Sequence, residues 1–269
     1  MAMMSYLKNR KSIRDFQDKS LTGDEISNIK NAFNEIKEKF DWGDFNLEVY
    51  EDGEEIYREL ENKAGYAGVM IKSPGYIYLN LKNQDKLTYV HGAFVLGELI
   101  TRLVDFGLGN CVITLGDNLV ESKKKLFGEM EDGIDYLIAI GHSTPSPALK
   151  KDGTYSSRKP VEEIAFLDAD FRQPANEKLR DLNMLELFSA IRYAPSYRNK
   201  QPWRFVITNS EVHVYVQNDE DLRSSLTDVG IIMYYFQEMA KTMGIKGNWE
   251  IVSELVPDRQ FIELGRFKI

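Results

Sequence analysis

Two spacings of apolar residues along the chain predict a mixture of helices and strands. Helical spacing marks residues 5–14, 22–36 and 86–106, and then 183–192, 221–226 and 228–243. Alternating or continuous apolar runs mark strands at 45–50, 76–81, 111–115 and 136–141, and then at 205–208, 212–216, 249–255 and 260–268. A stretch rich in Pro and Ser at 143–160 separates the two sets and predicts a connection between two halves.

The two long helices belong to an internal repeat. Gly92, Gly109, Asn110 and Ile113 recur 138 positions later as Gly230, Gly247, Asn248 and Ile251. Two earlier helices also match, with Leu7, Ile13 and Arg14 corresponding to Leu185, Ile191 and Arg192. A helix, a glycine turn and a strand therefore recur, which predicts two related halves at residues 1–165 and 166–269.

Each half carries a motif that the other lacks. The first half has Arg10, Lys11, Ser12 and Arg14, three cations and a hydroxyl that could bind a phosphate dianion. A solvated basic face is the alternative interpretation. The second half has a stretch from Ala194 to Trp203 that contains two prolines, amides and aromatic residues. It could present hydrogen-bonding groups to a planar heterocycle and a polyol, or it could be an ordinary loop between a helix and a strand.

Composition narrows the classes of function. Hydrophobic residues make up 43% of the 269 residues, enough for a real core, and the net charge of −8 argues against a general nucleic-acid or anionic-membrane surface. The most apolar segment, residues 93–104, contains Glu98 and Arg102 and predicts no membrane span. One cysteine excludes an intrachain disulfide. With no apolar signal region at the N-terminus, we expect a cytoplasmic protein without nucleic-acid or membrane partners.

Other catalytic chemistries fit the sequence poorly. His91, His142 and His213 are scattered and have no metal-ligand spacing to each other or to Cys111, so no metal site is predicted. The segment Gly107–Val112 lacks the third glycine of a dinucleotide fingerprint and follows a helix rather than a strand. The residues thus indicate a phosphate and a planar ligand without a protein-borne catalyst, which favours a cofactor that carries its own chemistry.

The two motifs resemble those of a known family. Residues Arg10 to Phe16 resemble the N-terminal phosphate motif of FMN-dependent nitroreductases, and Ala194 to Trp203 resembles the second flavin motif of that family. The turn at Gly107–Cys111 and the segment Arg158–Ile164 are similar to further landmarks. The resemblance implies an α+β nitroreductase-like fold with a mixed sheet flanked by helices. Since each half retains one motif, it also implies a fused pseudo-dimer with one flavin site per chain, a monomer rather than a homodimer.

The resemblance assigns roles to residues on both halves. It implies that Arg10, Lys11, Ser12 and Arg14 hold the phosphate and ribityl chain of FMN, with Arg158 as a further phosphate partner. Pro195, Ser196, Tyr197 and Asn199 would contact the isoalloxazine and ribityl groups. Thr114, Leu115 and Gly116 would face the flavin edge and could donate a backbone N–H. No catalytic side chain is assigned, because the flavin carries the chemistry.

The function that the resemblance implies is an NAD(P)H:acceptor oxidoreductase. A hydride would pass from NADH or NADPH through FMN to a small-molecule electron acceptor such as a nitroaromatic or a quinone. Two alternatives remain at this stage. The chain could bind flavin without turnover, as a carrier or sensor, or it could be a degenerate scaffold without a cofactor.

Overall fold

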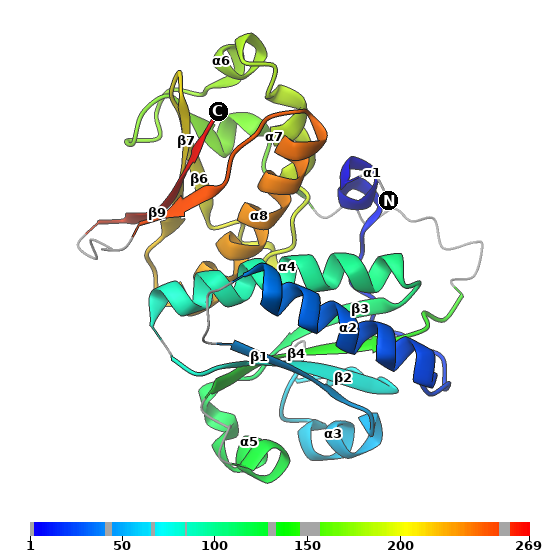
Figure 1. Cartoon of the computed structure of the whole chain (residues 1–269). Helices are drawn as coiled ribbons and strands as arrows, with labels where there is room; N and C mark the ends of the chain where they lie inside the picture. The colour runs from blue at the N-terminus through cyan, green and yellow to red at the C-terminus, as the bar shows by residue number, and fades with distance from the viewer. Residues whose placement is uncertain are drawn as a thin grey trace. The chain divides into compact units, whose positions relative to one another are not determined.

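The structure, a computed structural model, describes residues 3–40, 45–65, 68–83, 85–128, 133–145, 157–252 and 259–269 (Figure 1). By compactness the chain divides into two units, which are described separately. Unit 1 comprises residues 1–10, 89–97 and 152–269, and unit 2 comprises residues 11–88 and 98–151. These units do not coincide with the predicted halves at 1–165 and 166–269. The boundary between the halves stays a prediction.

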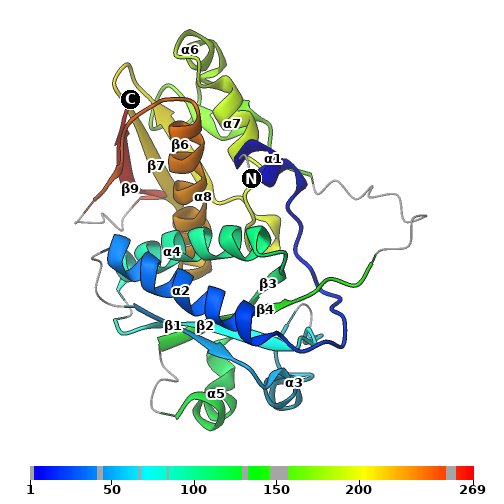
Figure 2. The same cartoon turned by 45° about the vertical axis from the view of Figure 1, so that its right-hand side comes forward.

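Unit 2 is built on an antiparallel sheet of four strands in the order β1-β2-β4-β3. The strands are β1 (Phe45–Tyr50), β2 (Gly75–Leu81), β3 (Gly109–Thr114) and β4 (Ile134–Gly141). The helices are α2 (Gly23–Lys39), α3 (Gly53–Leu60), the short η1 (Asp117–Leu119), α5 (Val120–Phe127) and the end segments of α4 (Lys86–Asp105), whose residues 89–97 belong to unit 1. Figure 2 shows α2 on one face of this sheet and α3 and α5 on the other.

Local sequence explains how unit 2 forms these elements. The predicted capping box at the start of α2 is confirmed, since the Thr22 side chain accepts from the Glu25 N–H and the Glu25 carboxylate accepts from the Thr22 N–H. Every residue of β4 is buried, as expected of a strand covered on both faces. Tyr78 of β2 packs on Phe127 of α5, with ring centroids 5.1 Å apart. Helices α3 and α5 and the strands that they cover thus share one hydrophobic core on this face of the sheet.

Unit 1 is built on a sheet of five strands in the order β5-β6-β7-β9-β8. The strands are β5 (Ala165–Phe166), β6 (Trp203–Ile207), β7 (Glu211–Gln217), β8 (Trp249–Ile251) and β9 (Phe261–Lys268). The helices are α1 (Met3–Asn9), η3 (Val161–Glu163), α6 (Asn176–Asp181), α7 (Leu185–Ile191), η4 (Tyr197–Asn199) and α8 (Leu222–Thr242). Among the described strands of this sheet, β5 and β6 pair in parallel and the other neighbours pair antiparallel.

The two sheets share one strand order. The order β1-β2-β4-β3 of unit 2 recurs in unit 1 as β6-β7-β9-β8. A long helix also lies between the second and third strands of each set in the chain, α4 in one and α8 in the other. This common arrangement is consistent with the internal duplication that the repeat predicts.

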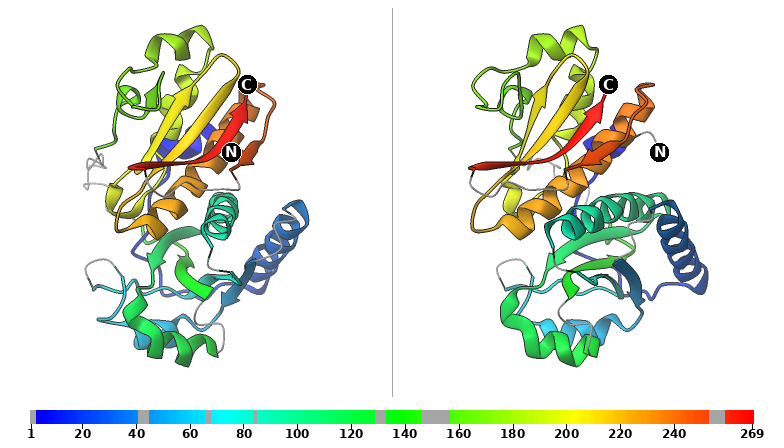
Figure 3. Two further views of the ribbon diagram at one scale, coloured as in Figure 1. Left: turned by 90° about the vertical axis from the view of Figure 1, so that its left-hand side faces the viewer. Right: turned by 60° about the vertical axis from the view of Figure 1, so that its left-hand side comes forward.

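The core of unit 1 lies between α8 and one face of its sheet (Figure 3). Strand β7 alternates strictly, so Val212, Val214 and Val216 are buried on the face toward α8. A cluster of aromatic rings fills the same layer, with centroid distances between 5.0 and 6.1 Å: Phe188, Phe205, Phe236, Trp249 and Phe267. Burial of each such side chain contributes about 1.5–3 kcal/mol to the stability of the fold.

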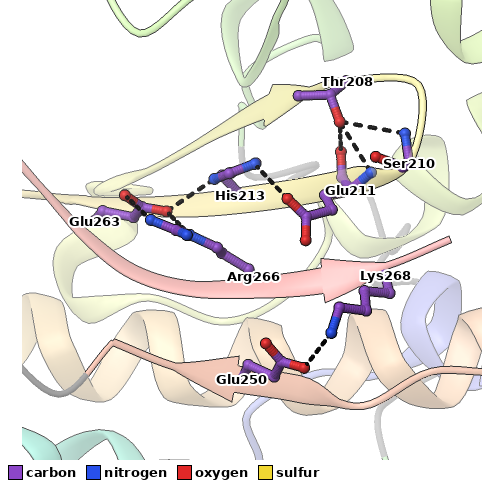
Figure 4. A network of polar contacts seen from close by, with 8 residues as sticks. All are labelled: Thr208, Ser210, Glu211, His213, Glu250, Glu263, Arg266 and Lys268. Atoms are coloured by element: carbon purple, nitrogen blue, oxygen red, sulfur yellow. Dashed lines mark hydrogen bonds and ion pairs between the residues drawn. The ribbon is translucent and has the colours of Figure 1, made fainter.

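The opposite face of the unit 1 sheet carries charged side chains (Figure 4). His213 lies between Glu263, 2.8 Å from its Nδ1, and Glu211, 3.4 Å from its Nε2. Arg266 donates from Nε to Glu263 at 2.7 Å, and Lys268 pairs with Glu250 at 2.6 Å. Thr208 closes the β6–β7 turn by accepting the Glu211 N–H at 2.9 Å. The contacts of His213 with Glu263 and of Lys268 with Glu250 join neighbouring strands, and the others lie within one strand or turn.

A glycine permits the close approach of α8 to residues 89–97 of α4. A Cβ atom at Gly230 would lie 2.5 Å from the carbonyl oxygen of Val90 and 2.6 Å from Cβ of Ala93. Helix α4 itself has the length and composition of a membrane span, which the sequence did not lead us to expect, but 78% of its most apolar window is buried inside the protein. Such burial is typical of a core helix.

Several predicted boundaries were wrong. Helix α1 ends at Asn9 rather than at residue 14, and the predicted helices at 221–226 and 228–243 are one continuous helix, α8. Asn183, taken as the start of a helix, has a φ of 55° and follows α6, where a left-handed residue closes a helix end. Strand β8 ends at Ile251, and residues 253–255 of the predicted strand lie outside the described residues, as do 146–156 of the predicted connection.

Candidate functional site

The segment between α7 and β6 has an unusual backbone. After Ser196, whose φ of −148° is extended, the chain forms the short turn η4. Arg198, Asn199 and Gln201 have φ angles of 49°, 57° and 51°, in the left-handed region that non-glycine residues seldom occupy. Such conformations persist only where surrounding contacts hold them, and they are frequent at functional sites. We refer to residues 195–202 as the Pro-Ser loop.

Side chains hold the Pro-Ser loop in this conformation. The Tyr197 N–H donates to both carboxylate oxygens of Asp228, at 3.0 and 2.9 Å. The Gln201 N–H donates to the Ser196 hydroxyl at 3.1 Å, which links the two ends of the loop. Gln201 is buried, and its side-chain oxygen accepts the Lys159 N–H at 2.8 Å. The loop is thereby fixed both to α8 and to the segment that begins at residue 157.

Two residues to which the family resemblance assigns contacts with FMN lie in contact with each other at this loop. Arg158 donates from Nη1 to the Asn199 side-chain oxygen at 2.6 Å, and the Asn199 amide donates to the Ser157 carbonyl at 2.9 Å. These residues are 41 positions apart in the chain. The structure thus brings together Arg158 and Asn199, while Ser196 and Tyr197 supply contacts within the loop.

Positive charge is concentrated beside this contact. Burial, together with the positive charges of Arg10 and Arg192, lowers the pKa of Arg158 to about 10, against the opposing attraction of Asp228. Arg10 follows α1 directly, and Arg192 follows α7. All of these residues belong to unit 1. Crowded cations of this kind are stabilised by an anion, and guanidinium groups suit the oxygens of a phosphate.

An unsatisfied donor also fits an anionic ligand. The Nε of Arg192 is buried, and no described residue accepts its hydrogen. Buried donors are normally paired, so an orphaned donor in a basic cluster needs an explanation such as an absent ligand. The residues present therefore fit a phosphate-bearing group such as that of FMN.

A single buried carboxylate balances part of this charge. Burial raises the pKa of Asp228 well above its ordinary value, and the Tyr197 N–H and the charges of Arg158 and Lys200 oppose that rise. Lys200 also pairs with Asp221 and with Asp219, the latter at 3.9 Å. Asp228 is thus both a structural acceptor and a counter-charge.

The remaining predicted residues lie in unit 2. The Ile13 N–H between Ser12 and Arg14 donates to the Asn110 carbonyl at 2.9 Å, so the basic motif runs beside the start of β3. The Leu115 N–H donates to the Asp135 carbonyl at 2.8 Å, and a backbone donor from this turn would therefore have to be Thr114 or Gly116. That Lys11, Ser12, Arg14, Thr114, Leu115 and Gly116 join the same site stays a prediction.

Three residues of the site were not found by sequence reasoning. Arg192 had been matched to Arg14 in the repeat, which was a usable signal for a second basic residue. Asp228 is a carboxylate in a run of α8 that is buried from Ser225 to Gln237. Gln201 lies within the motif from Ala194 to Trp203, but the motif assigns no role to it. None of the three roles follows from local pattern, because each depends on contacts between distant segments.

The part of the chain that the structure describes contains no group of three or more His, Cys, Asp or Glu residues that could hold a metal ion. Cys111 is buried in β3. His142 lies 3.0 Å from Glu25, and His213 lies between two glutamates.

Comparison with known proteins places the chain in a family. The family described as "Putative TM nitroreductase" matches residues 2–240. The match spans most of the chain, and the chain therefore belongs to this nitroreductase family. No curated protein that was compared with the chain matches it in sequence.

Solved structures show the fold. A protein described as a putative nitroreductase from Thermotoga maritima is 15% identical, with a TM-score of 0.62 over 100% of this chain and 93% of that chain. The predicted α+β nitroreductase-like fold is therefore confirmed. An FMN-dependent nitroreductase from Clostridium difficile is 19% identical, with a TM-score of 0.45 over 53% of this chain and 88% of that chain. A nitroreductase family protein from Streptococcus pneumoniae is 16% identical, with a TM-score of 0.43 over 60% of this chain and 97% of that chain.

Proposed function

We propose that the protein is an FMN-dependent oxidoreductase that passes a hydride from NADH or NADPH to a nitroaromatic, a quinone or a similar acceptor. The observation that carries the proposal is the meeting of Arg158 and Asn199 within a basic cluster that contains Arg10 and Arg192. Membership of a nitroreductase family supports the redox class.

The residues of unit 1 have distinct proposed roles. Arg158, Arg192 and Arg10 bind the phosphate of FMN through charge-assisted hydrogen bonds. Asn199 orients the Arg158 guanidinium, and the Pro-Ser loop forms the wall against the ribityl and ring portions. Bound FMN would supply the hydride acceptor and donor, so the protein contributes binding, orientation and electrostatic stabilisation. The predicted residues of unit 2 are proposed to complete the site.

Arg158→Gln tests the phosphate role. The substitution removes the charge while the side chain keeps hydrogen-bonding groups, and we expect FMN affinity to fall roughly 10- to 100-fold, the effect of losing a hydrogen bond to a charged group. Arg180→Gln, an exposed arginine of α6, is the matched control and should bind FMN as the unchanged protein does. Quenching of flavin fluorescence measures both affinities.

Turnover is tested separately. The protein saturated with FMN should oxidise NADH or NADPH in the presence of a nitroaromatic or a quinone. The loss of absorbance of the reduced nicotinamide measures this oxidation. A protein that binds FMN at one equivalent per chain but shows no oxidation with any acceptor would support a carrier or sensor. A protein that shows neither binding nor a thermal shift with FMN would overturn the proposal.

A further inference from the structure

Asp228 is a buried charge whose position needs an explanation. Its exposed fraction is 6%, and it is the one charged residue in the run of α8 that is buried without interruption from Ser225 to Gln237. Burying a carboxylate is costly unless hydrogen bonds and opposite charges compensate it. An apolar residue at this place would pack against the rest of the helix surface without that cost.

The compensation comes from the Pro-Ser loop. Both oxygens of Asp228 accept the Tyr197 N–H, the first amide of the turn η4. The charges that act on the carboxylate are those of Arg158 and Lys200. Every group that faces Asp228 in these contacts thus belongs to the loop or to the arginine that the loop holds.

The bond lies where the loop turns into its left-handed path. Tyr197 directly precedes Arg198 and Asn199, both with positive φ, and Asn199 in turn accepts from Arg158. A left-handed conformation costs roughly 1–2 kcal/mol for each non-glycine residue, so the turn needs an external anchor. Asp228, on α8, supplies that anchor through the Tyr197 N–H. Asn199, two residues after Tyr197, then accepts from Arg158 and orients it.

We infer that Asp228 is the positioning residue of the cofactor site, which holds the Tyr197 amide so that the Pro-Ser loop delivers Asn199 to Arg158. The inference rests on the proposed function for its ligand, but the anchoring itself can be measured without one. In this role Asp228 acts on the site through Tyr197, Asn199 and Arg158.

Two substitutions at this position separate anchoring from charge. Asp228→Asn keeps a carbonyl oxygen that can accept the Tyr197 N–H, whereas Asp228→Ala removes the acceptor. Glu238→Ala is the control, because this partly exposed carboxylate of the same helix pairs with Lys241 and lies outside the loop contacts. Circular dichroism and thermal unfolding show whether each variant is folded.

Hydrogen exchange of the FMN-free protein, followed by mass spectrometry, is the first measurement. We expect peptides that cover residues 195–202 to exchange at least 10-fold faster in Asp228→Ala than in the unchanged protein, Asp228→Asn or Glu238→Ala. Equal protection in Asp228→Ala, in a folded protein, would overturn the inference whether or not FMN binds.

FMN titration of the same variants is the second measurement. Asp228→Ala should lose at least 10-fold in affinity, and Asp228→Asn should recover most of that loss. If the unchanged protein binds FMN and both variants bind it equally well, positioning by Asp228 is wrong while the proposed function stands. If the unchanged protein does not bind FMN, the proposed function fails and the exchange result alone decides the role of Asp228.

Discussion

The segments that follow α1 and α7 are held in different ways. Residues 13–17 are held by backbone bonds: the Ile13 N–H to the Asn110 carbonyl at 2.9 Å, the Gln17 N–H to the His142 carbonyl at 2.8 Å, and the Thr144 N–H to the Asp15 carbonyl at 3.0 Å. The Pro-Ser loop also contains backbone bonds, but its contacts with α8 and with Lys159 come from the side chains of Asp228 and Gln201, and the Ser196 hydroxyl links its two ends.

This difference predicts how much change of sequence each segment tolerates. Backbone bonds form with almost any side chain, so the sequence of the first segment can vary. The Pro-Ser loop needs particular acceptors at fixed positions, and its sequence is correspondingly restricted. We therefore expect substitutions in the loop to destabilise the fold itself, and those in the first segment to leave stability almost unchanged.

The largest difference should separate two glutamines. Gln201→Ala removes the acceptor of the Lys159 N–H and a buried side chain, and we expect the free energy of unfolding to fall by about 2 kcal/mol. Gln17→Ala removes only an exposed bond to the Ser143 carbonyl at 2.9 Å and should cost less than about 0.5 kcal/mol. Urea unfolding of the FMN-free variants gives both values, and equal losses would contradict the comparison.

A smaller effect is expected at Ser196. Its hydroxyl accepts the Gln201 N–H at 3.1 Å, and Ser196→Ala should destabilise the protein by about 1 kcal/mol. The matched control is Ser189→Ala in α7, where the hydroxyl donates to the Leu185 carbonyl one turn earlier. Alanine favours a helix at that position, so this control should be neutral or slightly stabilising. A loss in Ser189→Ala as large as in Ser196→Ala would show that the loop is not specially dependent on side chains.

Arg198 tests the left-handed backbone directly. Its side chain is exposed and its φ is 49°, so Arg198→Gly should be more stable than Arg198→Ala by about 1 kcal/mol. At ordinary positions the order is reversed, because glycine has the greater freedom in the unfolded chain. Thermal unfolding of the two variants shows the order, and a more stable alanine variant would argue against the observed turn.

Sequence reasoning found the elements and the two motifs but not the contacts that make the site. The strands at 45–50 and the helix from Lys86 follow from periodicity, because apolar spacing reports directly on a buried face. The division of α8 between residues 226 and 228 was wrong, because the helix is continuous there. The Asp228 carboxylate is visible in the sequence, but its partner, the Tyr197 amide, lies 31 positions away and has no signature in the sequence. The prediction of a helix start at Asn183 was wrong because asparagine is favoured both at the start of a helix and as the left-handed residue after a helix.

Two carboxylates, Glu25 and Asp228, should contribute to stability with opposite pH dependences. Burial opposes the ionised form of Glu25 at the start of α2, but the Thr22 N–H, the Thr22 hydroxyl, His142 and Lys19 together outweigh it, so the pKa of Glu25 is lowered. Its contribution to stability is present above the ordinary value of 4.5 and is lost as the pH falls through the lower folded value. Asp228 has a raised pKa because of burial, so the folded protein binds more protons than the unfolded chain above the ordinary value of 3.8. Stability from this residue therefore falls as the pH rises through that window.

The variants Glu25→Gln and Asp228→Asn should reveal these opposite slopes. The stability of the unchanged protein relative to Glu25→Gln should decrease toward acid pH below about 4.5, whereas its stability relative to Asp228→Asn should decrease as the pH rises above about 3.8. Urea unfolding from pH 3.5 upward, without FMN, measures both differences. Slopes of the same sign would mean that the Tyr197 N–H and the charges of Arg158 and Lys200 outweigh the burial of Asp228 and hold its carboxylate ionised in the folded protein.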